Sequence, residues 1–191
     1  VSYLSMVLND IGVNAKAMTG YQAGIKTVGH PLKSKIAEIN PNIFNEAFKN
    51  HDILVVAGFQ GINEDFELTT LGRGGSDTTA VALAASNQTP CEIYTDVDGV
   101  YATDPRILNE AKRLEYVSYE EMMEMSALGA GVLETRSVEL AKNYDIPLYL
   151  GRTLSNVKGT WIMSKSDLLE KKAVTSVALD THMMHVTISY P

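Results

Sequence analysis

The sequence contains a single cysteine, Cys91, among its 191 residues. One cysteine cannot form an internal disulfide, so the disulfide-stapled scaffolds of small secreted proteins are excluded. The chain also lacks a run of about 18 apolar residues, the length that a membrane-spanning helix needs, and no signal peptide is visible. We therefore expect a reducing, cytoplasmic setting with no membrane partner.

Positive charge is scarce as well. The chain carries 16 Lys and Arg against 23 Asp and Glu, which gives a formal net charge of −7. Nucleic acids and acidic membrane surfaces attract basic proteins, so we expect no nucleic-acid partner. The hydrophobic content of 45% is ample for a core, and the length suits one domain, or one domain and part of another.

Residues that bind metals or act as nucleophiles are few and scattered. None of the four histidines forms a pair with the spacing of metal ligands on a helix. Cys91 begins an apolar stretch and is better explained as a small buried hydrophobe than as a nucleophile. The sequence therefore predicts no metal site built from protein side chains.

A glycine-rich stretch at 68–80, LTTLGRGGSDTTA, is the strongest local signal. Its glycines let the backbone approach a ligand closely, and Ser76 is a favourable N-cap for a following helix. An arginine, free N–H groups and a helix N-terminus together form an anion site. A plain turn between strand and helix remains the alternative, and the stretch matches neither a P-loop nor G-x-G-x-x-G.

Apolar patterning predicts alternating strands and helices. The run Ile53–Ala57 is continuously apolar, as in strands that are buried on both faces of a parallel sheet. With the glycine loop, the helix from Ser76 and the strand 91–95, it would form a βαβ unit. The other predicted helices are 1–11, 41–48, one capped by Ser118 and Glu121, and 132–144. Asn40 would be the N-cap of the second of these, with Pro41 at its first position. The other predicted strands are 13–18, 146–150, 160–163 and 184–190.

A second loop, 95–106, follows the strand 91–95 and carries Asp96, Asp98, Asp104, Tyr101 and Arg106. Ligands gather at the carboxyl ends of strands in open α/β sheets, which favours a nucleotide pocket here. Tyr101 would lie against a base, and Arg106 would meet a phosphate oxygen. A structural loop is the alternative, and a calcium loop is disfavoured because its twelfth position is not Glu.

The two loops together favour phosphoryl transfer, which depends on positioning and charge neutralisation more than on a covalent nucleophile. This interpretation requires Arg73 and Arg106 to face one shared cleft. Four segments then resemble the aspartokinases of the amino-acid kinase superfamily. They are GFQG at 58–61, TTLGRGGSDTTA at 69–80, CEIYTDVDGVYATDPR at 91–106 and LGAGVLETRSVELA at 128–141. The resemblance is collinear over about residues 1–165.

This resemblance implies a three-layer α/β/α sandwich with a mainly parallel sheet. It implies a catalytic domain at 1–170 and, at 171–191, a linker and the first strand region of an ACT-type regulatory domain. It also implies ATP-dependent phosphorylation of the L-aspartate side chain, the first step towards lysine, threonine and methionine. Mg²⁺ would arrive with ATP, held mainly by the phosphates.

Site residues follow from the same resemblance. Asp77 would be catalytic, by orienting a lysine. The substrate would be bound by Phe59, Thr70, Arg73, Gly74, Gly75 and Ser76. The nucleotide would be bound by Thr95, Asp96, Tyr101, Arg106, Gly131 and Val132.

The chain departs from the family pattern in three ways. The N-terminal K-F-G-G strand has no counterpart, Gly131 and Glu134 stand where many members have Lys and His, and the ACT region stops after about one strand. We therefore expect little or no turnover from these 191 residues alone. A feedback amino acid and a homo-oligomer are expected of the longer protein. Another kinase of this fold, or a non-catalytic regulatory subunit, is the alternative.

Overall fold

A computed structural model describes residues 1–128, 132–164 and 174–178 of the chain. Helices and strands alternate along the sequence, and no sheet among the described residues closes into a barrel. Four of the seven strand pairs in this part are parallel. The expected α/β class is confirmed, although the strands are divided among three sheets.

The main core lies against a four-stranded sheet with the order β7-β9-β10-β8. Its strands are β7 (Cys91–Thr95), β8 (Tyr116–Ser118), β9 (Leu148–Arg152) and β10 (Thr160–Met163). Buried side chains from this sheet join those of three helices, α3 (Gly75–Asn87), α4 (Tyr119–Ala127) and α5 (Thr135–Tyr144). The small residues of α3 are largely buried.

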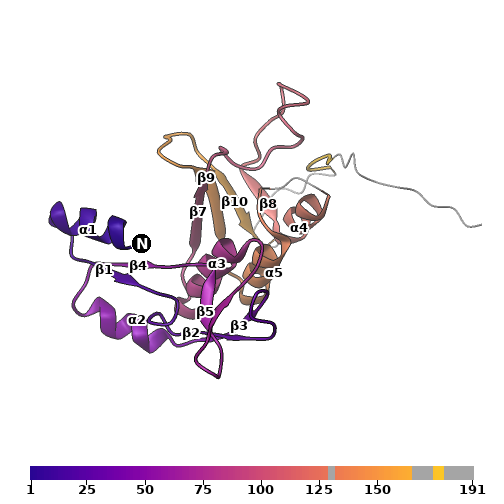
Figure 1. The fold of residues 1–191 in the computed structure, drawn as a ribbon. Coiled ribbons are helices and arrows are strands. Elements are labelled where there is room, and N and C mark those ends of the chain that lie inside the picture. Colours follow the sequence, from indigo (N-terminus) through magenta and orange to yellow (C-terminus); the bar gives the residue numbers. More distant parts are fainter. Residues whose placement is uncertain (129–131, 165–173, 179–191) are drawn as a thin grey trace, which may run out of the picture.

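A second sheet has the order β3-β2-β5-β6. It is formed by β2 (Ile25–Val28), β3 (Lys35–Ile39), β5 (Gln60–Ile62) and β6 (Leu68–Thr70). Figure 1 shows α3 and α5 side by side, and α3 contacts both β7 of the main sheet and β3 of this one. Strands β5 and β6 pair antiparallel, so that Gln60 lies opposite Thr70. This pairing brings the GFQG segment beside the glycine-rich loop.

The third sheet consists of β1 (Ala15–Met18) and β4 (Ile53–Val56), paired in parallel. The expected parallel pairing of this apolar run is confirmed, but its burial on both faces is wrong, because Ile53 is 38% exposed and the rest of β4 is half-buried. Two strands alone cannot shield both faces. The predicted βαβ unit is also wrong, since β4 and β7 belong to different sheets and the β5–β6 hairpin intervenes.

Helix α1 (Ser2–Asp10) covers part of β1. It buries only Ser5, while the apolar positions Leu4, Val7 and Ile11 remain exposed. No helix among the described residues has both the length and the apolar character needed to cross a bilayer.

Helix α2 (Pro41–Phe48) begins as predicted, with Asn40 as its N-cap and Pro41 at the first position. The Asn40 side-chain oxygen accepts a hydrogen bond from the N–H of Asn42 at 3.1 Å. An N-cap of this kind satisfies one of the helix's free donors.

Replacing Asn40 with alanine removes this cap and is expected to lower the free energy of unfolding by about 1 kcal/mol. Asn40→Asp should retain most of the stability, because aspartate caps equally well. Asn42→Ala is the matched control, since Asn42 contributes only its backbone N–H to the cap. Chemical denaturation of the three variants measures the difference. Equal losses for Asn40→Ala and Asn42→Ala would contradict the capping role.

The capping box predicted at the start of α4 is present. The hydroxyl of Ser118 accepts from the backbone N–H of Glu121, and the Glu121 carboxylate accepts from the N–H of Ser118. The predicted domain boundary near residue 170 and the predicted strand at 184–190 lie outside the described residues.

Candidate functional site

The glycine-rich loop runs from the end of β6 to the start of α3. Gly72 and Gly74 have φ values of 76° and 65°, a left-handed conformation that disfavours residues with a Cβ. Gly74 is the N-cap of α3, and no side chain makes a capping hydrogen bond there. The expectation that Ser76 caps this helix is therefore wrong. The left-handed turn at Gly74 starts the helix one residue before Ser76.

Phe59 and the first turn of α3 are in close contact. A Cβ added to Gly75 would lie 2.7 Å from the Phe59 ring and 2.9 Å from Cβ of Leu71. Phe59 itself has a φ of 69°, which is unusual for a large side chain. Its N–H donates to Oγ1 of Thr79, and its carbonyl accepts from the N–H of Leu71. Phe59 is thus held against the loop.

Arg73 projects from the tip of the loop, and its side chain is 94% exposed. Its Nε lies 2.9 Å from Oε1 of Glu134, the residue before α5. Both side chains line a cavity of about 540 Å³, together with Gly74, Asp77 and Val132, and with Ser126, Leu133 and Thr135. Residues from the loop and from the segment before α5, far apart in the sequence, therefore meet at one cavity.

Asp77 lies in the first turn of α3 and is half-buried. Burial raises the pKa of its carboxyl group above the ordinary value, and the negative charge of Glu134 raises it further. A hydrogen bond with Ser76 acts in the opposite direction. The ionised carboxylate is consequently held at a cost in folding free energy.

Replacing Asp77 with asparagine is expected to raise the melting temperature at pH 7. A carboxyl group whose pKa is raised in the folded state destabilises the fold when ionised, and this penalty disappears as the pH falls through the folded pKa towards 3.8. The gain of Asp77→Asn over the wild type should shrink over that range. Asp52→Asn is the exposed control. A gain that grows on acidification would contradict the assigned direction.

Arg136 ties three segments together behind the loop. Its Nη1 donates to the carbonyl of Leu71 at 3.0 Å, and its Nη2 donates to the carbonyl of Ser34 at 3.2 Å. Ser34 also donates its N–H and its hydroxyl to the carbonyl of Thr70. The backbone of Thr70 is thus engaged by neighbouring segments, and Arg136 holds the loop in place from α5.

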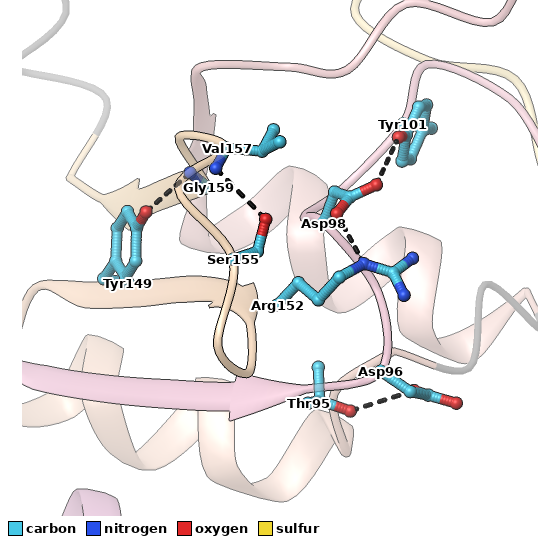
Figure 2. A network of polar contacts seen from close by, with 9 residues as sticks. All are labelled: Thr95, Asp96, Asp98, Tyr101, Tyr149, Arg152, Ser155, Val157 and Gly159. Atoms are coloured by element: carbon cyan, nitrogen blue, oxygen red, sulfur yellow. Dashed lines mark hydrogen bonds and ion pairs between the residues drawn. The ribbon is translucent and has the colours of Figure 1, made fainter.

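A second cluster of polar residues lies where β7 and β9 end (Figure 2). The hydroxyl of Thr95 donates to Asp96 at 3.1 Å, and the N–H of Thr153 donates to the carbonyl of Thr95. Beside them, Nε of Arg152 donates to Oδ1 of Asp98 at 2.6 Å. These carboxyl ends of adjacent parallel strands are where ligands collect in α/β proteins.

Asp98 links two members of this cluster. Its second oxygen accepts from the hydroxyl of Tyr101 at 3.4 Å, so that Asp98 lies between Tyr101 and Arg152, as Figure 2 shows. The hydrogen bond from Arg152 lowers the pKa of Asp98. Asp98 is therefore ionised at neutral pH and engaged within the protein.

Arg106 has a different environment from the other predicted nucleotide ligands. Its Nε and Nη2 donate to the carboxylate of Asp104, two residues earlier, and the side chain is 88% exposed. Among the described residues, the lining of the cavity at Arg73 does not include Arg106. That Arg73 and Arg106 face a common cleft stays a prediction.

The structure thus brings together Phe59, Arg73, Gly74, Gly75 and Asp77 around the loop, with Ser76 exposed on the same helical turn and Val132 on the cavity wall. Thr95 and Asp96 lie at the second cluster, and Tyr101 belongs to it through its hydrogen bond to Asp98. Gly131 lies outside the described residues. Sequence reasoning missed the contacts of Glu134, Arg136 and Arg152. The one sequence signal among them was Glu134, which departs from the family pattern.

Metal and thiol chemistry find little support in the part of the chain that the structure describes. No group of three or more His, Cys, Asp or Glu side chains there could hold a metal ion. Cys91 is buried, and desolvation is the main cause that raises the pKa of its thiol to about 11. The expectation that Cys91 is a small buried hydrophobe is confirmed.

Known proteins resemble this chain along most of its length. The model of the amino acid kinase family matches residues 1–152. Aspartokinase 2 of Bacillus subtilis is 46% identical over 189 residues, which are 98% of this chain and 46% of that protein. The aspartokinase of Geobacillus stearothermophilus is 42% identical with the same coverage. The chain spans about half the length of the curated relatives that it matches.

Solved structures of aspartokinases have a similar fold. The crystal structure of E. coli aspartokinase III in complex with aspartate and ADP has a TM-score of 0.75 and 30% sequence identity, and the match covers 84% of this chain and 37% of that one. The aspartate kinase of Synechocystis has a TM-score of 0.69 and 39% identity, covering 93% and 28%. On the match over residues 1–152 and these shared structures, the chain belongs to the amino acid kinase family.

Proposed function

We propose that the full-length gene product phosphorylates the side-chain carboxylate of L-aspartate with ATP, giving 4-phospho-L-aspartate. The observation that carries this proposal is the cavity at the N-terminus of α3, lined by Arg73, Gly74 and Asp77. It supplies a guanidinium and a helix N-terminus for a carboxylate ligand. The curated relatives named aspartokinase and the aspartate complex of the E. coli enzyme support the choice of substrate.

In this proposal Arg73 binds a carboxylate of the substrate, as one planar guanidinium can do through two donors. Gly74, Gly75 and Ser76 supply backbone N–H groups from the first turn of α3, with Phe59 and Thr70 beside them. An oxygen of the substrate carboxylate attacks the γ-phosphorus, and the bond from that phosphorus to the bridging oxygen breaks to release ADP. The attacking carboxylate is already ionised at neutral pH, so the step requires no general base.

Asp77 is assigned the catalytic role of orienting a cationic group towards the phosphates. Its carboxylate lines the same cavity as Arg73, which supports the assignment. The main obstacle to the reaction is the repulsion between two anionic reactants. Preorganised positive charge and helix-end N–H groups offset that repulsion, and this is the usual form of catalysis in phosphoryl transfer.

ATP is assigned to the second cluster. Thr95 and Asp96 at the end of β7 would hold the nucleotide, Tyr101 would lie against it, and Arg106 would exchange Asp104 for a phosphate. Gly131 and Val132 would complete the site from the segment before α5. Mg²⁺ bound with ATP would neutralise phosphate charge. In this proposal the ion is held mainly by those phosphates.

Several broader features belong to the same proposal. We place the gene product in the cytoplasm, in the biosynthesis of lysine, threonine and methionine, as a homo-oligomer with ACT-type regulatory segments and a feedback amino acid. A catalytic domain at 1–170 and the start of an ACT-type segment at 171–191 are its proposed divisions. The E. coli enzyme has been solved with lysine and aspartate, which supports a feedback ligand of this class.

Trapping of the acyl phosphate with hydroxylamine tests the proposal directly. The full-length gene product is assayed with ATP and four acceptors: aspartate, glutamate, UMP and carbamate. Hydroxamate formation that depends on aspartate is the expected result. ADP release is measured alongside, because phosphorylation of UMP gives UDP and no hydroxamate. Turnover of another acceptor in place of aspartate would assign the protein to a different kinase of this fold. The UMP kinase of Ureaplasma parvum shares the fold, at 17% identity and a TM-score of 0.57.

A further inference from the structure

Glu134 stands at a helix N-cap, a position that rarely holds glutamate. It is the N-cap residue of α5, yet its side chain makes no capping hydrogen bond. Glutamate is absent from the preferred N-cap residues, which are Ser, Thr, Asp, Asn and Gly. A local rule broken without an evident structural gain is typical of functional positions.

The Glu134 side chain is directed at the glycine-rich loop. Its Oε1 lies 2.9 Å from Nε of Arg73. Its stem lies against Gly74, so closely that a Cβ on Gly74 would overlap Cβ and Cγ of Glu134. The left-handed glycine therefore leaves the space that Glu134 fills, and the carboxylate is held beside the guanidinium.

The charges at the cavity indicate that the Glu134 carboxylate competes with an anionic ligand for Arg73. Two carboxylates, Asp77 and Glu134, share the lining with Arg73, the one Lys or Arg side chain among its lining residues in the described part of the chain. A ligand carboxylate that approaches Arg73 must share the guanidinium with Glu134 or displace it. Because Arg73 is exposed, the Arg73–Glu134 pair is weak, and displacement costs little.

We propose that Glu134 competes with the substrate carboxylate for Arg73. The substrate displaces Glu134 from Arg73 when it binds, and the Arg73–Glu134 pair thereby sets the affinity of the site for that substrate. Glu134 acts through Arg73 and is a positioning residue. This inference rests on the proposed function, because it concerns the carboxylate-binding step. It assigns Glu134 an effect on KM with little effect on the chemical step.

The test compares Glu134→Gln with the wild type in the full-length gene product. Glutamine keeps the size of the side chain and removes its charge. We expect the KM for aspartate to fall about three- to fivefold, the range of a weak exposed ion pair. The kcat and the KM for ATP should stay unchanged. Glu46→Gln on α2, which removes an exposed carboxylate paired with Lys49, is the matched control and should change nothing. A KM for aspartate that is equal to or above the wild-type value overturns the proposal.

A double-mutant cycle with Arg73→Gln shows whether Arg73 mediates the effect. The gain from Glu134→Gln should vanish in the Arg73→Gln background, and a gain that persists there overturns the mechanism. Calorimetric titration of the same proteins with sodium succinate, a dicarboxylate, gives a second readout that requires no turnover. Tighter succinate binding by Glu134→Gln supports the proposal even in a protein that does not phosphorylate aspartate, and equal binding contradicts it. Failure of the proposed function and failure of this inference are therefore distinguishable.

Discussion

Replacing Arg73 with alanine in the full-length gene product is expected to raise the KM for aspartate about 10- to 100-fold, because a charge-assisted hydrogen bond to the substrate carboxylate is lost. Arg73 is exposed and lies at the tip of a loop, so the variant should fold normally. Its melting temperature should match that of the wild type, and the KM for ATP should change little. Steady-state kinetics with each substrate varied in turn measures the effect.

Two further variants sharpen this prediction. Arg73→Lys keeps the charge and loses the planar fork of donors, so its KM should lie between those of the wild type and Arg73→Ala. Lys26→Ala removes an exposed cation on β2, paired with Glu38, and should leave the kinetics unchanged. An unchanged KM for aspartate in Arg73→Ala would remove this side chain from the substrate site.

Replacing Gly74 with alanine is expected to reduce kcat/KM for aspartate by at least about tenfold. The φ of 65° is strained for alanine by about 1–2 kcal/mol. The added Cβ would also overlap the Glu134 stem at the start of α5. Either the loop or α5 must then move, and a small displacement of a positioning group is costly in catalysis.

Gly29→Ala is a matched control for that variant. Gly29 has a φ of 93°, but no heavy atom lies within 4 Å of a Cβ added there. It therefore tests backbone strain without the steric overlap. We expect Gly29→Ala to lose stability and keep its kinetics, whereas Gly74→Ala loses both. Equal kinetics in the two variants would show that the space beside Gly74 is not needed for function.

Sequence reasoning was most successful where local chemistry decides the structure. The cap at Asn40 and the capping box at Ser118 depend on residues within a few positions of one another, and both are confirmed. Strand β10 was predicted with its observed bounds for the same reason. The α/β class followed from the alternation of such elements.

The failures concern relations between distant segments. The run Ile53–Val56 has the composition of a fully buried strand, yet its burial depends on how many strands flank it, which composition does not encode. Ser76 is a better N-cap by residue type than Gly74, but the backbone turn of the loop decided the helix start. Side-chain pairs across long separations, such as Arg152 with Asp98, carried no local signal.

In the candidate site, too, residues in continuous motifs could be predicted, whereas contacts between distant segments could not. The glycine-rich loop and the residues after β7 were identifiable from short motifs, because each is continuous in sequence. Glu134 was noticed only as a departure from the family pattern, and its contact with Arg73 required the fold. The contact of α5 with the glycine-rich loop, from Arg136 to the carbonyl of Leu71, could not be read from either segment alone.

The bonds of Arg136 have a consequence for the order of events when the chain folds. They join α5 to carbonyls 65 and 102 residues away in the sequence. Contacts between such remote segments require the ends of long stretches of chain to meet, which is slow compared with helix formation. The loop that presents Arg73 should therefore reach its final shape late, after the helices and hairpins on either side have formed. A newly synthesised chain would then acquire its secondary structure before it can hold a ligand.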